Sequence, residues 1–233
     1  MLFPFENLIQ DFSRLLFPHY CVACGSDLSQ RDTILCYRCQ LDLPTTNFFS
    51  IPNNPVEKSF YGRLNLQAAG ASFYFTKDSL LQYLLSELKY KQNIAVGFYL
   101  GRMMGYQLKL SERFASIDLL IPMPLHPKKQ QIRGYNQATI ICNGIQSVWK
   151  KPIAENAIIR KVFTDSQTLQ DRIHRWENMQ GIFAVKNKAQ IIQKHLLLVD
   201  DVTTTGASLE ALGSVLEAEK GVKISVATAA YTL

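Results

Sequence analysis

The chain has 233 residues, 47% of them hydrophobic and 19% charged, with a formal net charge of +6. This length suffices for one sizeable α/β domain with a small appendage, and the composition excludes a disordered or fibrous protein. The sequence shows no run of about 20 apolar residues that would span a membrane and no secretory signal pattern. We therefore expect a cytoplasmic protein without membrane insertion. The basic excess is compatible with phosphate or nucleic-acid ligands but does not establish either.

The first forty residues predict a helix followed by a metal-binding module. Apolar side chains recur at helical spacing over residues 1–18, which predicts a helix packed against the main domain. Two Cys-x2-Cys pairs follow, Cys21 with Cys24 and Cys36 with Cys39, and Gly25 supplies the positive φ that such knuckles favour. Four thiolates leave no open coordination position, so we predict a structural Zn²⁺ rather than a catalytic one; a redox dithiol is the alternative.

The next segment predicts the domain organisation. Pro44, Pro52 and Pro55 stand near an Asn-Asn pair within residues 42–66, a composition typical of a linker or irregular arm. We therefore divide the chain into a helix and zinc module (1–43), a linker or arm (44–66) and a main domain (67–233).

The first part of the main domain predicts one strand and two helices. Residues 68–75 are expected to form the strand, and a leucine-rich helix capped by Thr76 or Asp78 follows it. That helix ends in Lys89-Tyr90-Lys91, which either grips a phosphate or nucleic-acid strand or forms a solvated helix end. A second helix is expected over 94–110.

Residues 117–121 are predicted to be the first strand of the main sheet. A basic loop with Lys128, Lys129 and Arg133 follows, and then a helix that runs to about Trp149. Because α/β folds bind ligands at the carboxyl ends of their strands, cations here indicate a pyrophosphate site; a basic surface loop is the alternative. Cys142, within the helix, is predicted to be a core residue.

The remaining elements complete the α/β pattern. Residues 157–161 and 181–185 predict short strands, and between them the polar loop 163–180 has the length of a lid or binding segment. Gly221 is expected to end the last helix as its C′ residue, and residues 222–230 to form the final strand. Strands that alternate with helices predict a mostly parallel sheet with right-handed crossovers.

The stretch 194–210 combines a strand, two acids and a small-residue turn before a helix. Leu196–Val199 read as a strand buried on both faces, followed by Asp200 and Asp201 and then a threonine-rich turn. Such a turn at a helix N-terminus can hold a phosphate, while two carboxylates would accept hydrogen bonds from a diol or hold a divalent cation. A diol beside a phosphate describes a ribose 5-phosphate. A polar turn that only caps the helix is the alternative.

The sequence LLLVDDVTTTGAS resembles the 5-phosphoribosyl 1-pyrophosphate (PRPP) signature of type I phosphoribosyltransferases. The resemblance implies a mostly parallel sheet with helices on both faces, and Mg²⁺ bound together with PRPP. It also implies that Asp200 and Asp201 face the ribose hydroxyls. The 5-phosphate would be wrapped by Thr203, Thr204, Thr205, Gly206, Ala207 and Ser208.

Taken together, the motifs LLFPHYCVACG, IPMPLHPKKQQIRGYNQA and VDDVTTTGAS resemble the ComF family over nearly the whole chain. That family includes proteins of late competence and of gluconate utilisation. The resemblance implies that the protein binds Mg-PRPP and handles incoming single-stranded DNA in natural transformation, with competence proteins such as a DNA translocase or helicase as partners. The implied pyrophosphate loop consists of Met123, Pro124, Leu125, Lys128 and Arg133. Family members often carry arginine where Lys128, Lys129 and Gln131 stand here, which predicts a looser grip on the anion.

Three functions remain open from the sequence. The protein transfers a phosphoribosyl group to an unknown acceptor, or it handles nucleic acid, or it senses PRPP as a regulator without turnover. Binding and catalysis share every motif, so the sequence does not identify catalytic residues, an acceptor or an oligomeric state.

Overall fold

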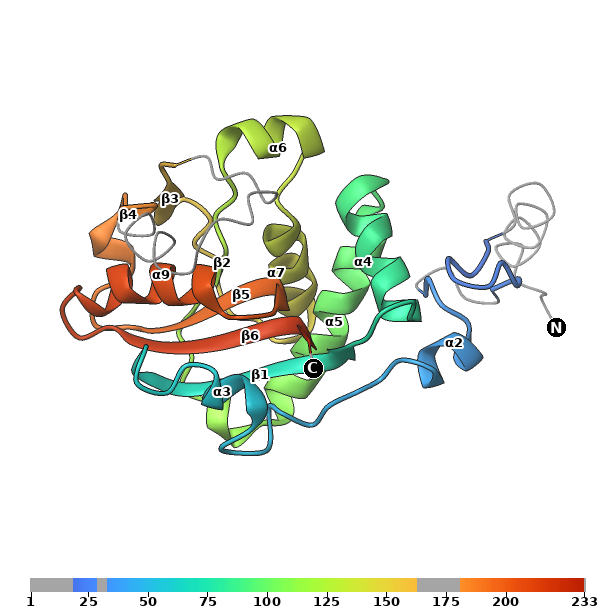
Figure 1. The fold of residues 1–233 in the computed structure, drawn as a ribbon, viewed down its shortest axis with the longest axis horizontal. Coiled ribbons are helices and arrows are strands. Elements are labelled where there is room, and N and C mark those ends of the chain that lie inside the picture. Colours follow the sequence, from blue (N-terminus) through green and yellow to red (C-terminus); the bar gives the residue numbers. More distant parts are fainter. Residues whose placement is uncertain (1–18, 29–32, 163–180, 233) are drawn as a thin grey trace, which may run out of the picture.

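The computed structural model describes residues 19–28, 33–162 and 181–232. The helix expected within 1–18 and the polar loop expected at 163–180 lie outside the described residues. The main sheet has four parallel strands in the order β1–β6–β5–β2 (Figure 1). Their bounds are β1 Leu66–Phe75, β6 Lys223–Thr232, β5 His195–Thr203 and β2 Leu119–Pro122. The predicted α/β class with a mostly parallel sheet is confirmed.

One expectation about strand order was wrong. The strand near residue 117 is not the first of the main sheet, because β1 pairs with β6 along its length and forms the opposite edge. The short strands β3 (Ile158–Arg160) and β4 (Phe183–Val185) pair with each other antiparallel and form a separate ribbon. Long-range pairing of this kind has no local signal in a single sequence.

Helices cover both faces of the sheet (Figure 1). One face packs against α4 (Leu80–Tyr90), α5 (Ile94–Leu110) and α7 (Gln137–Val148), and the other against α9 (Ala207–Glu217) and the short α3 (Pro55–Lys58). Within the described ranges, the remaining short helices are α2 (Tyr37–Leu41), α6 (Pro127–Arg133) and two 3₁₀ turns, η1 (Glu112–Phe114) and η2 (Lys188–Gln190).

Two helix ends differ from the sequence expectation. The cap of α4 is Ser79, whose side chain accepts from the Gln82 amide at 3.2 Å, because Asp78 has a left-handed φ of 58°. α9 ends at Glu217, and Gly221 takes its φ of 69° in the turn before β6 rather than at the C′ position. Such boundary shifts arise because several neighbouring residues can serve as caps.

The core is divided by the sheet. In β5, Leu197 and Val199 face the α5 and α7 side, while Leu196 and Leu198 face α9. This confirms a strand buried on both faces, as parallel strands between helical layers are. The predicted core position of Cys142 on α7 is confirmed as well, since its side chain is fully buried and burial raises the pKa of its thiol.

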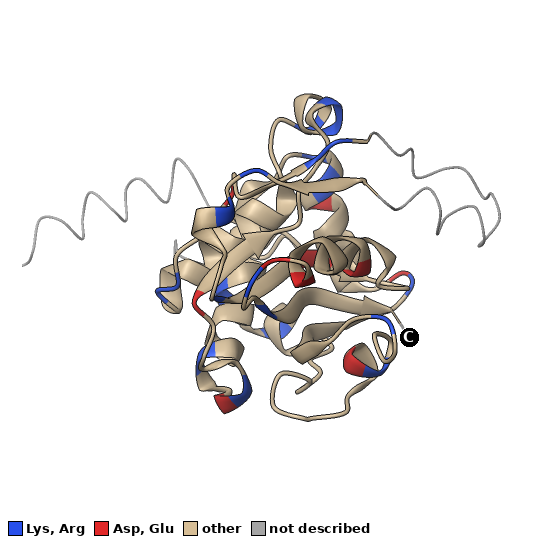
Figure 2. Ribbon diagram, turned by 90° about the vertical axis from the view of Figure 1, so that its left-hand side faces the viewer, with Lys and Arg blue, Asp and Glu red and all other residues tan. Residues whose placement is uncertain are grey.

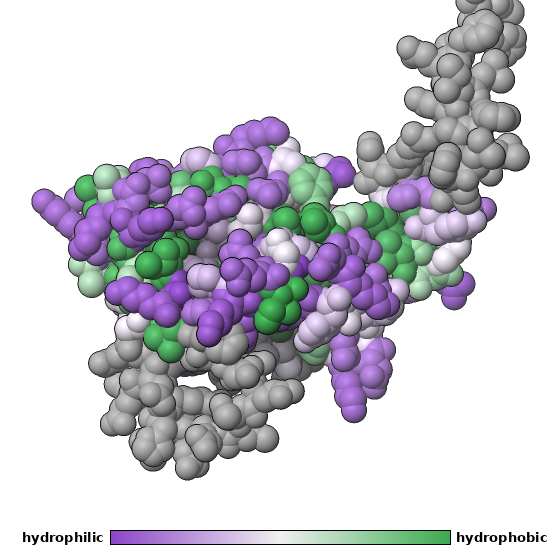
Figure 3. Space-filling view, turned by 90° about the horizontal axis from the view of Figure 1, so that it is seen from above, coloured by the Kyte–Doolittle hydropathy of each residue, from purple (hydrophilic) through white to green (hydrophobic). Residues whose placement is uncertain are grey.

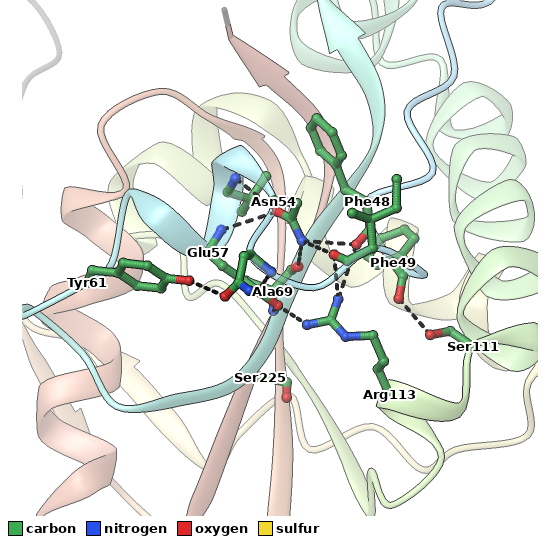
Figure 4. Close-up of polar contacts among 12 residues, drawn as sticks. Phe48, Phe49, Asn54, Glu57, Tyr61, Ala69, Ser111, Arg113 and Ser225 are labelled. Carbon is green, nitrogen blue, oxygen red and sulfur yellow. Dashed lines mark hydrogen bonds and ion pairs between the residues drawn. The ribbon is translucent and has the colours of Figure 1, made fainter.

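Residues 44–64 form an arm that includes α3 and packs against β1 through buried residues such as Phe48, Asn54 and Val56 (Figure 4). Buried Asn54 organises it: its Oδ1 accepts from the Val56 amide at 3.0 Å, and its Nδ2 donates to the carbonyls of Phe48 and Ala69 at 3.0 and 2.8 Å. Glu57 accepts from the Ala69 amide at 3.0 Å and pairs with Arg113. These bonds fix the arm to the sheet, and the arm in turn supports the site described next.

Candidate functional site

The site begins where β2 and β5 end side by side. Pro122 is in register with Val199, and the Met123 amide donates to the Val199 carbonyl at 2.8 Å. The turn that starts at Met123 therefore lies next to Asp200. This is the carboxyl edge of a parallel sheet, where α/β proteins bind ligands.

Two elements after β2 shape this edge. The predicted basic loop is in fact largely the seven-residue helix α6, which begins at Pro127 after the cap His126 and is followed by Gly134 with φ 80°. Proline pre-sets the helical φ at such a position, and glycine tolerates the left-handed one. Figure 2 shows α6, at the top of the molecule, with Lys and Arg and no acidic residue.

The turn between α6 and α7 is held by side-chain amides. Asn136 Nδ2 donates to the Met123 carbonyl at 2.9 Å, and its Oδ1 accepts from the Ala138 amide at 3.0 Å. Arg133 Nη1 donates to Gln137 Oε1 at 2.9 Å. Together these bonds place Arg133 and the start of α7 beside the end of β2.

The two carboxylates lie within β5, which extends past the predicted end at Val199. Asp201 Oδ2 is 2.8 Å from Lys89 Nζ, and Asp200 Oδ1 accepts from the Asp201 amide at 2.9 Å. Burial, together with the charge of Asp201, raises the pKa of Asp200 to about 7, while Lys89 and Arg160 oppose this rise. A half-buried acid pair of this kind is typical of functional sites rather than of solvated surfaces.

The last turn of α4 forms a third wall of the site. The Tyr135 hydroxyl donates to the Leu88 carbonyl, and the next residue, Lys89, reaches Asp201. Lys91 instead pairs with Glu87 on its own helix at 2.7 Å, and Tyr90 is 74% exposed. Of the Lys89-Tyr90-Lys91 motif, only Lys89 therefore faces the carboxylates.

The turn between β5 and α9 forms a small cavity that adjoins the cleft at the end of β2. It is lined by Thr203, Thr204, Thr205, Gly206, Ala207 and Ser208, and also by Asp200. Gly206 caps α9 with φ 73°, a left-handed conformation that favours glycine. A Cβ at this position would also lie 2.8 Å from the Phe60 ring, so the packing requires glycine as well. The buried Thr203 Oγ1 has no hydrogen-bond partner among the described residues.

The arm supports this turn from outside. Arg63 Nη1 donates to the Thr205 carbonyl at 2.9 Å and to the Ser59 carbonyl at 2.8 Å, and Arg63 also pairs with Glu210 on α9. The turn is therefore held from both the sheet and the arm before any ligand binds.

The sequence-predicted site residues fall into three groups. The cleft at the end of β2 is lined by Met123, Pro124, Leu125, Arg133, Asp200, Asp201 and Ser208. The threonine-rich turn lies in the adjoining cavity, which shares Asp200 and Ser208 with the cleft. Lys128 is exposed on α6 and does not line either cavity.

The cleft is also lined by five residues that sequence reasoning did not assign to it: Lys89, Asn136, Gln137, Ala138 and Arg160. Asn136, Gln137 and Ala138 lie shortly after Arg133, the last residue of the predicted pyrophosphate loop, so extending that loop to Ala138 would have included them. Arg160 carries a cation at the end of a predicted strand, which is the same signal that indicated Arg133. For Lys89, the sequence left open whether the Lys89-Tyr90-Lys91 motif contacts a ligand or is a solvated helix end.

The four cysteines come together as predicted. Their Sγ atoms all lie within 4.8 Å of one another, and the Cys36 amide lies 3.3 Å from Cys21 Sγ. Tetrahedral zinc with Zn–S bonds of about 2.3 Å requires sulfur separations of roughly 3.8 Å, so the donor set fits this ion. Hydrogen bonds from Ser26 lower the pKa of Cys24 to about 6, whereas burial raises the pKa of Cys39.

Among the described residues no helix is long and apolar enough to cross a membrane.

Together the fold and the site define an α/β protein with a ligand cleft at the carboxyl edge of its parallel sheet and a separate four-cysteine module. No family model matches the chain. Over 204 residues, 86% of this chain, it is 25% identical to competence protein F of Haemophilus influenzae and spans 79% of that protein. It is also 24% identical over 139 residues to the DNA utilization protein YhgH of Escherichia coli O157:H7 and of Shigella flexneri, spanning 60% of each. These similarities confirm the ComF-like assignment that the order of motifs predicts.

Proposed function

We propose that this protein binds Mg-PRPP at the carboxyl edge of its sheet and handles single-stranded DNA in competence or DNA utilisation. The observation that carries the first part is the meeting of three elements at one edge. An acid pair, a small-residue turn before a helix, and an arginine-bearing turn are brought together from β5, α9 and the β2–α7 connection. This combination suits a ligand with a diol between two phosphate groups.

Each element matches one part of that ligand. Asp200 and Asp201 accept hydrogen bonds from the ribose hydroxyls, because ionised carboxylates only accept. The amides and hydroxyls from Thr203 to Ser208 hold the 5-phosphate at the start of α9. Arg133 and the turn Met123–Leu125 face the pyrophosphate, which arginine can bind through two parallel bonds.

Magnesium fits this arrangement as part of the ligand. Mg²⁺ commonly keeps several waters and binds through substrate phosphates and one or two carboxylates. Asp201 is already paired with Lys89 at 2.8 Å, so the chain itself neutralises part of the acid pair. The metal would neutralise the pyrophosphate charge, while the chain's own residues orient the ribose.

The DNA role is supported by the named relatives, a competence protein and DNA utilization proteins. The basic helix α6 beside the cleft suits a phosphate backbone, which is bound mainly by cations and without reading sequence. Seen from above, hydrophilic residues dominate the visible face, with apolar side chains in small groups between them (Figure 3). Such a surface favours an electrostatic contact over an apolar protein interface.

The four-cysteine module is proposed to hold one structural zinc per chain. Four sulfur donors complete a tetrahedral shell, and zinc would bind all four cysteines as thiolates. Zinc would thereby stabilise a segment whose own apolar core is small.

A Mg-PRPP titration with and without single-stranded DNA, with pyrophosphate release followed in parallel, tests the proposal. We expect saturable Mg-PRPP binding and a DNA affinity that falls steeply with added salt. Pyrophosphate release only with DNA would couple the two ligands through turnover, and binding without release would indicate a sensor. If neither ligand binds, the proposal is wrong.

A further inference from the structure

The NH₂ group of one buried side-chain amide in the ligand cleft has no role in the assignments above. Gln137 is the first residue of α7, is only 4% exposed, and lines the cleft with Arg133, Asp200 and Asp201. Its Nε2 is buried and has no hydrogen-bond partner among the described residues. Buried unpaired donors are rare because desolvation is not compensated, so each one calls for an explanation.

The chemistry of its neighbour fixes which way this amide points. Arg133 Nη1 lies 2.9 Å from Gln137 Oε1. A guanidinium can only donate, so the amide must present its oxygen to Arg133 and its NH₂ group elsewhere. The orientation therefore does not depend on an arbitrary choice between oxygen and nitrogen.

The adjacent amide provides a contrast. Asn136 uses both ends of its side chain within the fold, donating to the Met123 carbonyl and accepting from the Ala138 amide. Gln137 uses only its oxygen, and its donor remains in a cleft that Lys89, Arg133 and Arg160 also line. Lys89 is paired with Asp201, whereas Arg133 and the unpaired N–H donor of Gln137 lie side by side in the cleft and suit an acceptor-rich anion.

We propose that Gln137 is a ligand-contact residue that donates from Nε2 to an oxygen of a phosphate or pyrophosphate group while its Oε1 orients Arg133. This inference rests on the proposed anion-binding function and adds a specific residue to it. Gln137 supplies a neutral donor of fixed direction, whereas the arginine beside it supplies charge. The same anion is thus held by two side chains that also hold each other.

A double-mutant cycle separates contact from mere support of Arg133. Inorganic pyrophosphate with Mg²⁺ is titrated calorimetrically into the full chain and into Gln137→Met, Arg133→Met and the double variant. Methionine keeps the length and volume of glutamine without its polar groups. Gln146→Met, farther along α7 and outside the cleft, is the matched control, and thermal denaturation checks that each variant folds.

We expect Gln137→Met to weaken pyrophosphate binding about tenfold or more, as the loss of a hydrogen bond to a charged group does. In the Arg133→Met background a further loss of at least about threefold is expected, and Gln146→Met should bind like the unchanged protein. As a second variant, Gln137→Glu keeps an acceptor for Arg133 but turns a carboxylate toward the anion, and it should lose at least as much affinity.

Two outcomes count against the inference in different ways. If Gln137→Met has no further effect once Arg133 is replaced, Gln137 acts only through Arg133 and the ligand contact is wrong. If the unchanged protein binds neither pyrophosphate nor Mg-PRPP, the proposed function is wrong and this inference is overturned with it.

Discussion

The four-cysteine module and the ligand cleft are built in opposite ways. All four sulfur atoms of the module come from residues 21–39, from two short knuckles whose spacing is visible in the sequence. The cleft takes its side chains from residues 89–208, on four helices, the ends of two strands of the main sheet and a strand of a separate ribbon. A module of the first kind would depend on a metal ion for its stability, whereas a site of the second kind depends on the whole sheet.

The charged groups of the two regions also differ in origin: those of the module lie close together in the sequence, whereas those of the cleft come from distant segments. In the module, hydrogen bonds lower the pKa of Cys24 and burial raises the pKa of Cys39, and one metal ion would be bound by all four cysteines together. The cleft balances two carboxylates against lysine and arginine that arrive from distant parts of the chain. Perturbing each region should therefore have separable consequences.

The largest effect is expected from removing a zinc ligand. Cys39→Ser should lose the bound zinc and unfold the module, because zinc binding contributes on the order of 10 kcal/mol to such small domains. Metal analysis should give one zinc per chain for the unchanged protein and none for the variant. Cys142→Ala, which removes the thiol on α7 instead, should retain the zinc. Equal metal content in the unchanged protein and Cys39→Ser would show that the module is not a zinc site.

An intermediate effect is expected from Lys89→Met, which leaves Asp201 without its cation. The pair is largely shielded from solvent, at 24% and 15% side-chain exposure, so its loss should lower the free energy of unfolding by about 2–3 kcal/mol at pH 8. Lys91→Met on the same turn removes a pair whose lysine is 62% and whose carboxylate is 10% exposed. It should cost less, about 1 kcal/mol, because Glu87 also accepts from Asn93 Nδ2. Urea denaturation measures both; equal losses would mean that the cleft pair is no stronger than the Lys91–Glu87 pair.

A smaller effect of opposite sign is expected from Asp200→Asn. The pKa of Asp200 is raised from 3.8 to about 7 in the folded protein, so its charge destabilises the fold above pH 7. That cost diminishes as the pH falls through 7 towards 4, because the folded protein then takes up the proton first. The variant should gain about 1–2 kcal/mol at pH 8 and less at pH 5. Denaturation curves at both pH values check this, and a loss of stability at pH 8 would contradict it.

The cysteine module, the buried strand β5 and the parallel sheet could be predicted from local sequence patterns. The cysteine spacing indicated the module, and the apolar run from Leu196 to Val199 indicated a strand buried on both faces. The alternation of strands and helices indicated the parallel sheet. These features are encoded within a few residues, where periodicity and spacing act.

The remainder depended on contacts between distant segments. β1 joins the main sheet through β6 near the end of the chain, and Lys89 meets Asp201 across the cleft. Gln137 stood beside a recognised motif, but its unpaired donor becomes apparent only when its burial is known. Helix boundaries, as at Gly221 and α6, were missed because several nearby residues could end or begin the helix.

The central claim is that the acid pair at the end of β5 binds the ribose of Mg-PRPP, and calorimetric titration of Mg-PRPP tests it most directly. The double variant Asp200→Asn with Asp201→Asn should lose at least about a hundredfold in affinity. Asp118→Asn removes a carboxylate beside the opposite end of the same strand, where it accepts from the His195 amide at 2.8 Å, and should bind normally. Unchanged affinity in the double variant would contradict the assignment of the site.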